Sequence, residues 1–147
     1  IKAIDICIAS AYQLLSTVRH PFGTLCDASS IYQLSACLRV AENLCIPEII
    51  READNGGCHV RDIAEQSDID PSKLARILRV LSSHHIFLEV SPDTFVNNRV
   101  SSFFDSGKHT LILKENPVDK YKDTVGICGY IGTCTDEVAK AASYLLE

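Results

Sequence analysis

The clearest pattern of apolar and polar positions in the chain lies in residues 70–98. Apolar residues recur there every three or four positions, which places them on one face of a helix. These residues are Leu74, Ile77, Leu78 and Leu81. Asp70 can cap this helix, and Pro71 suits its first position. Two short strand-like runs, residues 86–90 and 94–96, follow around a Ser-Pro-Asp turn, and a helix followed by a hairpin predicts a winged helix.

Two longer amphipathic helices are expected before this region. The first covers residues 1–19 and should end before His20-Pro21, because a residue that precedes proline is pushed out of helical geometry. Its apolar positions are Ile4, Cys7, Ile8, Ala11, Leu14, Leu15 and Val18. The apolar positions of the second helix are Ile31, Leu34, Leu38, Ala41 and Cys45. Ile46-Pro47 closes the second helix and begins a short helical piece over residues 48–53.

The segments on either side of the central helix are shorter. Residues 55–57, Asn-Gly-Gly, are the clearest turn in the chain. A short helix over 62–66 and a turn over 67–70 precede the central helix, and this spacing is typical of a helix-turn-helix. After the hairpin, residues 100–105 should add a helical turn. Residues 107–122 are expected to form a loop that holds at most one short helix.

A last helix is expected to start at Thr135, with Asp136 and Glu137 in its first turn. The predicted fold is therefore mainly α. It consists of a winged helix, that is, a helix-turn-helix plus a short β-hairpin, with extra helices before and after it.

Composition, charge and cysteine spacing argue against several classes of protein. The 147 residues are 46% hydrophobic and 22% charged, which suits one globular core, and the net charge of −5 argues against a nucleic-acid partner. Polar residues interrupt every apolar stretch, so no membrane helix is predicted. The seven cysteines stand singly with no C-x-x-C pair, which indicates reduced thiols in a cytoplasmic protein and no metal site. Because the chain has no Met, it is expected to be part of a longer protein.

Three cations on the polar side of the central helix are the candidates for DNA contact. Lys73, Arg76 and Arg79 lie three residues apart, where a recognition helix places its cations. However, residues 59–90 hold four cationic and five anionic side chains, and residues 86–98 of the wing contain no Lys or Arg. A solvated helix face is the favoured interpretation.

Two further motifs have residue types that are common in functional sites. Residues 126–132 are rich in glycine but do not match a phosphate-binding G-x-G-x-x-G loop, so close packing or a cavity lining is expected instead. His84-His85 ends the central helix, where a left-handed residue is usual, and we expect a positive φ at His85. No motif of a complete active site is present, so neither catalytic nor cofactor-binding residues are predicted in this chain.

Six segments in order resemble small-molecule O-methyltransferases, especially those of the fungal type. Residues 34–50 resemble the "alrvA-elgIPdlL" helix that opens the dimerisation domain of that family. The other five segments are 60–66 ("t-eLA"), 70–81 ("dp-kLaRlLRlL"), 84–90 ("hGiF-Ev"), 97–101 ("nnrlS") and 134–137 ("hcTDE"). One departure is His85, which stands where the family has glycine.

The resemblance implies a winged helix that mediates dimerisation. Residues 1–105 are then the dimerisation domain of a homodimer, and residues 106–147 lead to a catalytic domain that follows this chain and binds S-adenosylmethionine. The expected dimer face is Leu14, Leu15, Val18, Ile31, Leu34 and Leu38. The implied substrate is a small molecule, an aromatic or polyketide-type secondary metabolite that is methylated on a hydroxyl. The residues expected to line its binding site are Phe104, Tyr130, Ile131 and Cys134.

Two alternatives belong to other classes of protein. The first is a winged-helix regulator that reads DNA through the three cations of the central helix, with an affinity that falls steeply with salt. The second is a non-catalytic methyltransferase-like protein that pairs with an enzyme. A G-x-G-x-G strand-turn shortly after the present chain favours the enzyme over the non-catalytic partner.

Overall fold

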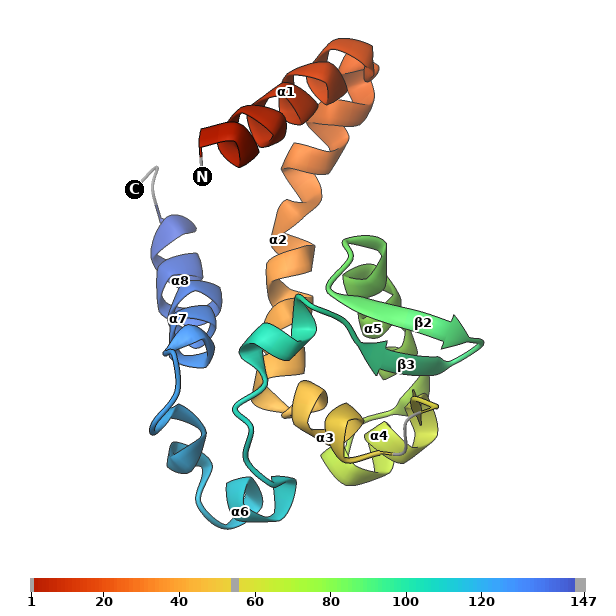
Figure 1. Ribbon diagram of the computed structural model, residues 1–147, viewed down its shortest axis with the longest axis vertical. Helices are drawn as coiled ribbons and strands as arrows, with labels where there is room; N and C mark the ends of the chain where they lie inside the picture. The colour runs from red at the N-terminus through yellow and green to blue at the C-terminus, as the bar shows by residue number, and fades with distance from the viewer. Residues whose placement is uncertain (1, 54–55, 145–147) are drawn as a thin grey trace. The chain divides into compact units, whose positions relative to one another are not determined.

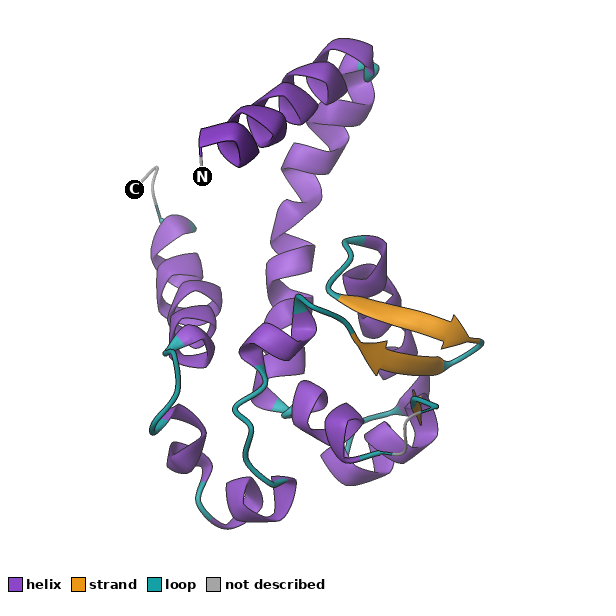
Figure 2. Cartoon of the chain, viewed as in Figure 1, coloured by secondary structure: helices purple, strands orange, loops and turns teal. Residues whose placement is uncertain are grey.

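The computed structural model describes residues 2–53 and 56–144, which are mainly helical with one small sheet (Figure 2). Asn55 of the predicted Asn-Gly-Gly turn lies outside the described residues. The α-helices are α1 (Lys2–Val18), α2 (Pro21–Asn43), α3 (Ile46–Glu52), α4 (Val60–Ser67), α5 (Pro71–Ser83), α6 (Thr110–Glu115), α7 (Ile127–Thr133) and α8 (Ala139–Ala142). The strands are β1 (Cys58–His59), β2 (Phe87–Ser91) and β3 (Thr94–Asn97). Two 3₁₀ helices, η1 (Ser101–Phe104) and η2 (Pro117–Tyr121), and a π-helical turn, η3 (Cys134–Val138), complete the chain.

The chain divides into two compact units at Gln33 and Leu34, and α2 runs across the boundary. The first unit consists of α1 and the first half of α2. None of the 17 residues of α1 is buried. Large apolar side chains of this unit are exposed, among them Ile4, Ile8, Leu14, Leu15, Val18, Phe22, Leu25 and Ile31. The predicted apolar stripe of the first helix is therefore present, and it faces solvent.

The second unit holds the hydrophobic core, which lies between α3, α4, α5 and the sheet. Fully buried members include Ile46, Ile49, Ile63, Leu74, Leu78, Leu81, Phe87 and Phe95. The sheet is antiparallel in the order β1-β3-β2, with Phe87 opposite Asn97 and Cys58 opposite Phe95. The β2–β3 hairpin lies beside α5 (Figure 1). The predicted winged helix is confirmed.

Helix α5 forms for the local reasons that its sequence indicates. The Asp70 carboxylate accepts hydrogen bonds from the backbone N–H of Lys73 at 2.9 Å and from the Ser72 hydroxyl at 2.6 Å, and Pro71 occupies the first turn. These hydrogen bonds lower the pKa of Asp70. The helix ends at Ser83, His84 is its C-cap, and His85 takes the predicted left-handed conformation with φ of 60°.

Three sequence predictions differ from the structure. Strand β1 was not expected, because two residues are too few to show the alternation of apolar and polar positions that marks a strand. They form a strand only through their pairing with β3. The prediction of at most one short helix in residues 107–122 is wrong, because both α6 and η2 are present. The last helical run starts at Ile127, eight residues before the predicted Thr135, because α7 continues through η3 into α8.

Helix α6 begins with the local cap of His109, whose side chain accepts a hydrogen bond from the backbone N–H of Leu111, and a distant residue adds a second cap. The Glu52 carboxylate at the end of α3 accepts hydrogen bonds from the backbone N–H of Thr110 at 2.8 Å and from its hydroxyl at 2.6 Å. A carboxylate at a helix N-terminus satisfies donors that otherwise have no partner. Glu52 is 58 positions away in the sequence, so local sequence patterns could not indicate this cap.

The left-handed residue after α5 leads to a stability prediction. An L-residue pays about 1–2 kcal/mol for left-handed geometry, whereas glycine does not, although glycine loses more backbone entropy on folding. We expect His85→Gly to raise the free energy of unfolding by about 1 kcal/mol. Urea denaturation checks this value. His84→Gly is the matched control, because His84 has φ of −100° and gains no relief from glycine. A less stable His85→Gly variant contradicts the prediction.

Candidate functional site

The residues expected to form a dimer face fall into two groups in the structure. Leu14, Leu15, Val18 and Ile31 belong to the first unit and are between 50% and 71% exposed. Leu34 and Leu38 belong to the second unit, where they are half-buried and pack against its core. Four of the six side chains are thus at least half exposed, and the other two pack against the core of the second unit.

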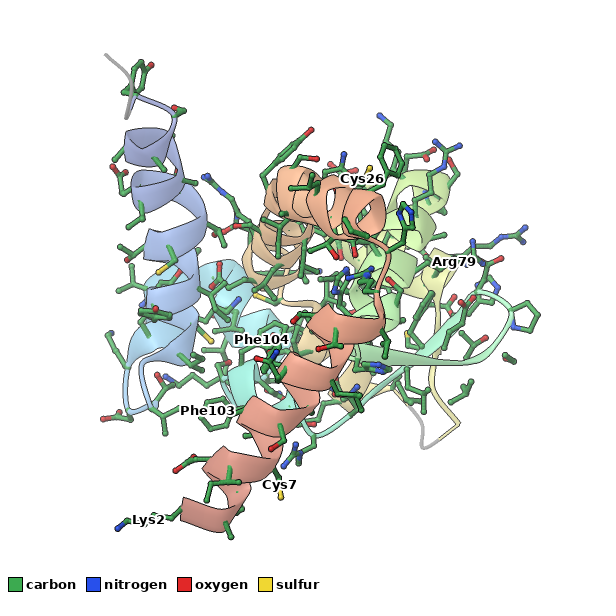
Figure 3. All side chains as sticks on the ribbon, turned by 90° about the horizontal axis from the view of Figure 1, so that it is seen from above. Lys2, Cys7, Cys26, Arg79, Phe103 and Phe104 are labelled. Carbon is green, nitrogen blue, oxygen red and sulfur yellow. The ribbon has the colours of Figure 1, made fainter. Side chains whose placement is uncertain are left out.

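The residues expected near a substrate also differ in exposure. Phe104 and Ile131 are buried in the core, and the Phe104 ring packs edge-on against Phe87 with 6.0 Å between ring centroids. Tyr130 is 67% exposed on α7, and its hydrogen bond to Cys134 raises its pKa. In η1 the neighbouring side chain of Phe103 is exposed, whereas Phe104 is not (Figure 3). A ligand can therefore reach Tyr130 directly, but Phe104 and Ile131 only by way of the core.

The polar face of α5 carries three cations, one of which is paired within the chain. Arg79 forms ion pairs with Glu89 at 3.0 Å and with Asp93 at 2.8 Å, both in the hairpin. These contacts lower the pKa of Glu89, chiefly through its hydrogen bonds from Arg79. Lys73 and Arg76 remain exposed. One of the three candidate cations thus fixes the wing to the helix, and the pairing leaves it no free charge for phosphate.

The segment that resembles "nnrlS" has a structural role. The Asn98 side-chain amide donates a hydrogen bond to the carbonyl of the left-handed residue His85 at 2.9 Å. Its side-chain oxygen accepts hydrogen bonds from the backbone of Val100 at 2.8 Å and of Ser101 at 3.1 Å. Asn97 donates to the Pro47 carbonyl at 2.8 Å. The two asparagines therefore connect the wing to the end of α5, to η1 and to α3.

A buried polar cluster that the sequence analysis missed joins α2, α3 and η2. Lys120 Nζ lies 3.2 Å from Glu42 Oε1 and 3.6 Å from the Cys45 thiol, and it also donates to the Glu42 carbonyl. The Tyr121 hydroxyl donates to Glu42 Oε1 at 3.4 Å, and Glu48 accepts from the backbone N–H of Ser106 at 3.0 Å. Glu42, Glu48 and Lys120 are each at most 4% exposed. A charged residue inside an amphipathic helix, as Glu42 is in α2, was the only signal in the sequence.

The pKa values in this cluster follow from burial and charge. Burial alone lowers the pKa of Lys120, but the negative charges of Glu48 and Glu42 and the hydrogen bond to Glu42 outweigh it, so the net shift is upward. Burial raises the pKa of the Cys45 thiol. Lys120 is thus held as an ammonium ion and Cys45 as a neutral thiol, which makes neither a nucleophile at neutral pH.

A second long-range ion pair fixes η3 to α2. The Arg39 guanidinium binds Asp136 with two short contacts, 2.7 Å from Nη2 and 2.6 Å from Nη1, and also donates to the Thr135 carbonyl at 3.4 Å. These contacts, with the hydrogen bond from Arg39 first, lower the pKa of Asp136. Arg39 and Asp136 both lie in segments that resemble family motifs. The resemblance therefore pointed to both segments, but it did not indicate that these two side chains form an ion pair.

The remaining chemistry-bearing groups are the cysteines and the side chains that could bind a metal ion. The seven cysteines are all free, and burial raises the pKa of Cys128 to about 11. Among residues 2–53 and 56–144, no group of three or more His, Cys, Asp or Glu side chains is arranged to hold a metal ion. Within the same residues, no helix is long and apolar enough to cross a membrane.

The fold and these contacts define a winged helix whose basic face is partly neutralised and whose N-terminal helices expose an apolar stripe. The profile of the O-methyltransferase dimerisation domain matches residues 26–106. The chain belongs to that family. An O-methyltransferase of Armillaria gallica is 40% identical over 99% of this chain and 31% of its own length. The 4-O-methyltransferase 1 of Phanerochaete chrysosporium is 38% identical over all of this chain and 31% of its own length.

Solved structures share the fold. LaPhzM superimposes with a TM-score of 0.67 at 20% identity, over 86% of this chain and 33% of that protein. A variant of LepI in complex with SAH and a substrate analogue superimposes with a TM-score of 0.64 at 13% identity, over 78% of this chain and 30% of LepI. The chain thus spans about a third of the length of the proteins it matches. The family match gives no support to a DNA-binding function.

Proposed function

We propose that this chain is the dimerisation and substrate-lid domain of a small-molecule O-methyltransferase that uses S-adenosylmethionine. The observation that carries the proposal is the family match over residues 26–106, together with fungal O-methyltransferases related along the whole chain. The cofactor and a histidine base belong to a catalytic domain that continues beyond residue 147. The free cysteines support a cytoplasmic protein.

We propose a homodimer in which α1 and the first half of α2 form the pairing surface. The support is the row of exposed apolar side chains on these helices, since contiguous apolar surface of this kind marks an interaction site. Leu14, Leu15, Val18 and Ile31 supply the exposed part of the surface. The other two residues proposed for pairing, Leu34 and Leu38, belong to the second unit, where they are partly accessible.

We propose that residues 1–105 form the dimerisation domain and that residues 106–147 lead into the catalytic domain. The end of the family match at residue 106 supports this division. In the second segment, Tyr130 and Cys134 lie at or near the surface and are the proposed contacts to an aromatic or polyketide-type substrate. Phe104 and Ile131 would support them from the core, or line the pocket where the substrate displaces a neighbouring side chain.

The experiment that tests the enzymatic role uses the full-length protein. Incubation with S-adenosylmethionine and a panel of phenols is expected to yield methylated product for at least one phenol, detected by mass spectrometry. S-adenosylmethionine alone is expected to raise the thermal midpoint, because a ligand that binds only the folded state stabilises it. If the cofactor binds but no phenol is methylated, the role is that of a non-catalytic partner. Absence of any cofactor binding would refute the methyltransferase proposal.

A further inference from the structure

The last helical run of the chain contains a π-helical turn. Helix α7 passes through η3 into α8 without a break (Figure 1). Turns of this kind are rare and occur frequently at functional sites. Tyr130 and Cys134, the proposed substrate contacts, lie four positions apart where η3 begins, and their side chains are hydrogen-bonded to each other. The geometry of η3 therefore affects how Cys134 is presented beside Tyr130.

The side chain of Arg39 reaches this turn from α2. Its guanidinium contacts the Asp136 carboxylate at 2.6 Å and 2.7 Å and the Thr135 carbonyl at 3.4 Å. A guanidinium that engages a carboxylate through two nitrogens fixes the orientation of the two groups as well as their distance. Asp136 also pairs with Lys140 of α8 at 2.5 Å. Arg39 thus binds the middle of η3, two positions after Cys134.

This ion pair matters more for orientation than for stability. The side chains of Arg39 and Asp136 are 36% and 26% exposed, and ion pairs that are open to solvent contribute little to the free energy of unfolding. Helix α7 is attached separately, because Cys128 and Ile131 are buried in the core. Loss of the Arg39 side chain should therefore leave the fold intact and release only η3.

We propose that Arg39 is a positioning residue for substrate recognition, which holds η3 so that Tyr130 and Cys134 contact a phenolic substrate together. The exposed ring of Tyr130 packs against the aromatic ring of the substrate, and Cys134 lies beside it. Arg39 acts only through Asp136 and Thr135. The inference rests on the proposed function, because it needs the substrate contacts that are proposed there.

Steady-state kinetics of the full-length protein, with S-adenosylmethionine and a phenol that it methylates, test the inference. Arg39→Gln keeps a polar side chain without the guanidinium, so the KM for the phenol should rise about tenfold, whereas the KM for S-adenosylmethionine should not change. Arg39→Lys keeps the charge but not the two-nitrogen contact and should lie between. Asp136→Asn should reproduce the effect of Arg39→Gln, and the double variant should be no worse than either single variant, because all three remove one interaction. An unchanged phenol KM in Arg39→Gln would overturn the inference.

Arg51→Gln is the matched control. Arg51 pairs with Asp105 at 2.7 Å, and its side chain is 38% exposed, close to the 36% of Arg39. This pair joins α3 to the residue after η1 and makes no contact with η3. Its loss should leave the KM for the phenol within about twofold of the natural value. A rise as large as that in Arg39→Gln would indicate general loosening of the fold and would contradict the positioning role.

Alkylation of Cys134 tests the position of η3 without any methylation. Iodoacetamide, mapped by mass spectrometry of the full-length protein, should modify Cys134 several-fold faster in Arg39→Gln, because a turn that is no longer held exposes the thiol. The exposed Cys26 is the internal reference, and its rate should not change. An unchanged rate at Cys134 contradicts the inference. If the natural protein methylates no phenol, the proposed function fails, and the alkylation rate still decides whether Arg39 holds η3.

Discussion

Lys120→Met is expected to lower the free energy of unfolding by about 3–5 kcal/mol, the range found when one partner of a buried ion pair is removed. Methionine fills a similar volume, so the loss comes from charge rather than from a cavity. It leaves Glu42 and Glu48 buried with no cation beside them. Urea denaturation followed by circular dichroism measures the effect.

The matched control is Lys122→Met, two positions along the chain. Lys122 pairs with Asp119 at 2.6 Å on the surface, so its replacement should leave stability nearly unchanged. The double variant Lys120→Met, Glu42→Gln should recover part of the loss, because it removes one of the uncompensated charges. If Lys120→Met is no more damaging than Lys122→Met, the buried pair does not hold η2 to α2.

The pKa shift of Lys120 adds a dependence on pH. Its pKa in the folded protein is raised above the value of about 10.4 that it has when unfolded. The stabilisation is therefore complete below that value and is lost as the pH rises through the folded pKa. The stability difference between the natural chain and Lys120→Met should accordingly shrink in alkaline buffer above about pH 10.4. A constant difference across that range would contradict the assignment.

Leu15→Asp is expected to raise the dissociation constant of the proposed dimer at least about 100-fold, because a buried leucine contributes about 1.5–3 kcal/mol and a two-fold interface contains it twice. Leu15 is half-exposed in the single chain, so the substitution should leave the fold of the second unit intact. Sedimentation velocity over a concentration series measures the dimer, and circular dichroism confirms the helix content.

Gln13→Asp provides the control for the added charge. Gln13 lies in the same helix but off the stripe that Leu15 and Val18 share, so its replacement should leave the dissociation constant within a few-fold of the natural value. A chain that stays monomeric at high concentration, both alone and within the full-length protein, would refute the pairing role. A dimer that tolerates Leu15→Asp would move the interface away from this face of α1.

Much of the winged helix could be predicted because its signals are local. The cap at Asp70 and the apolar face of Leu74, Leu78 and Leu81 lie within one helix, and His85 follows it directly. Strand β1 and the second helical segment of residues 107–122, η2, were not predicted, and each is held by a partner far along the chain. Cys58 becomes a strand residue only opposite Phe95, and Lys120 of η2 pairs with Glu42 of α2.

The candidate sites were likewise only partly predictable from the sequence. The exposed apolar stripe of α1 follows from its spacing, and the family resemblance rests on six motifs in order. The spacing did not reveal that Phe104 and Ile131 would be core residues, because an apolar residue in a short helix looks the same whether it faces a ligand or the interior.

The sequence by itself determined the helix-turn-helix and wing, the exposed apolar face of the first helix and the family to which the chain belongs. Helix caps, the spacing of apolar residues and ordered motifs are properties of residues that are close together in the sequence. Only the tertiary structure decided that Arg79 fixes the wing, that Arg39 binds Asp136, and that Glu42 and Lys120 are buried together. The two residues of the last pair are 78 positions apart. Burial and pairing across such a distance arise only when the chain packs, and no local pattern encodes them.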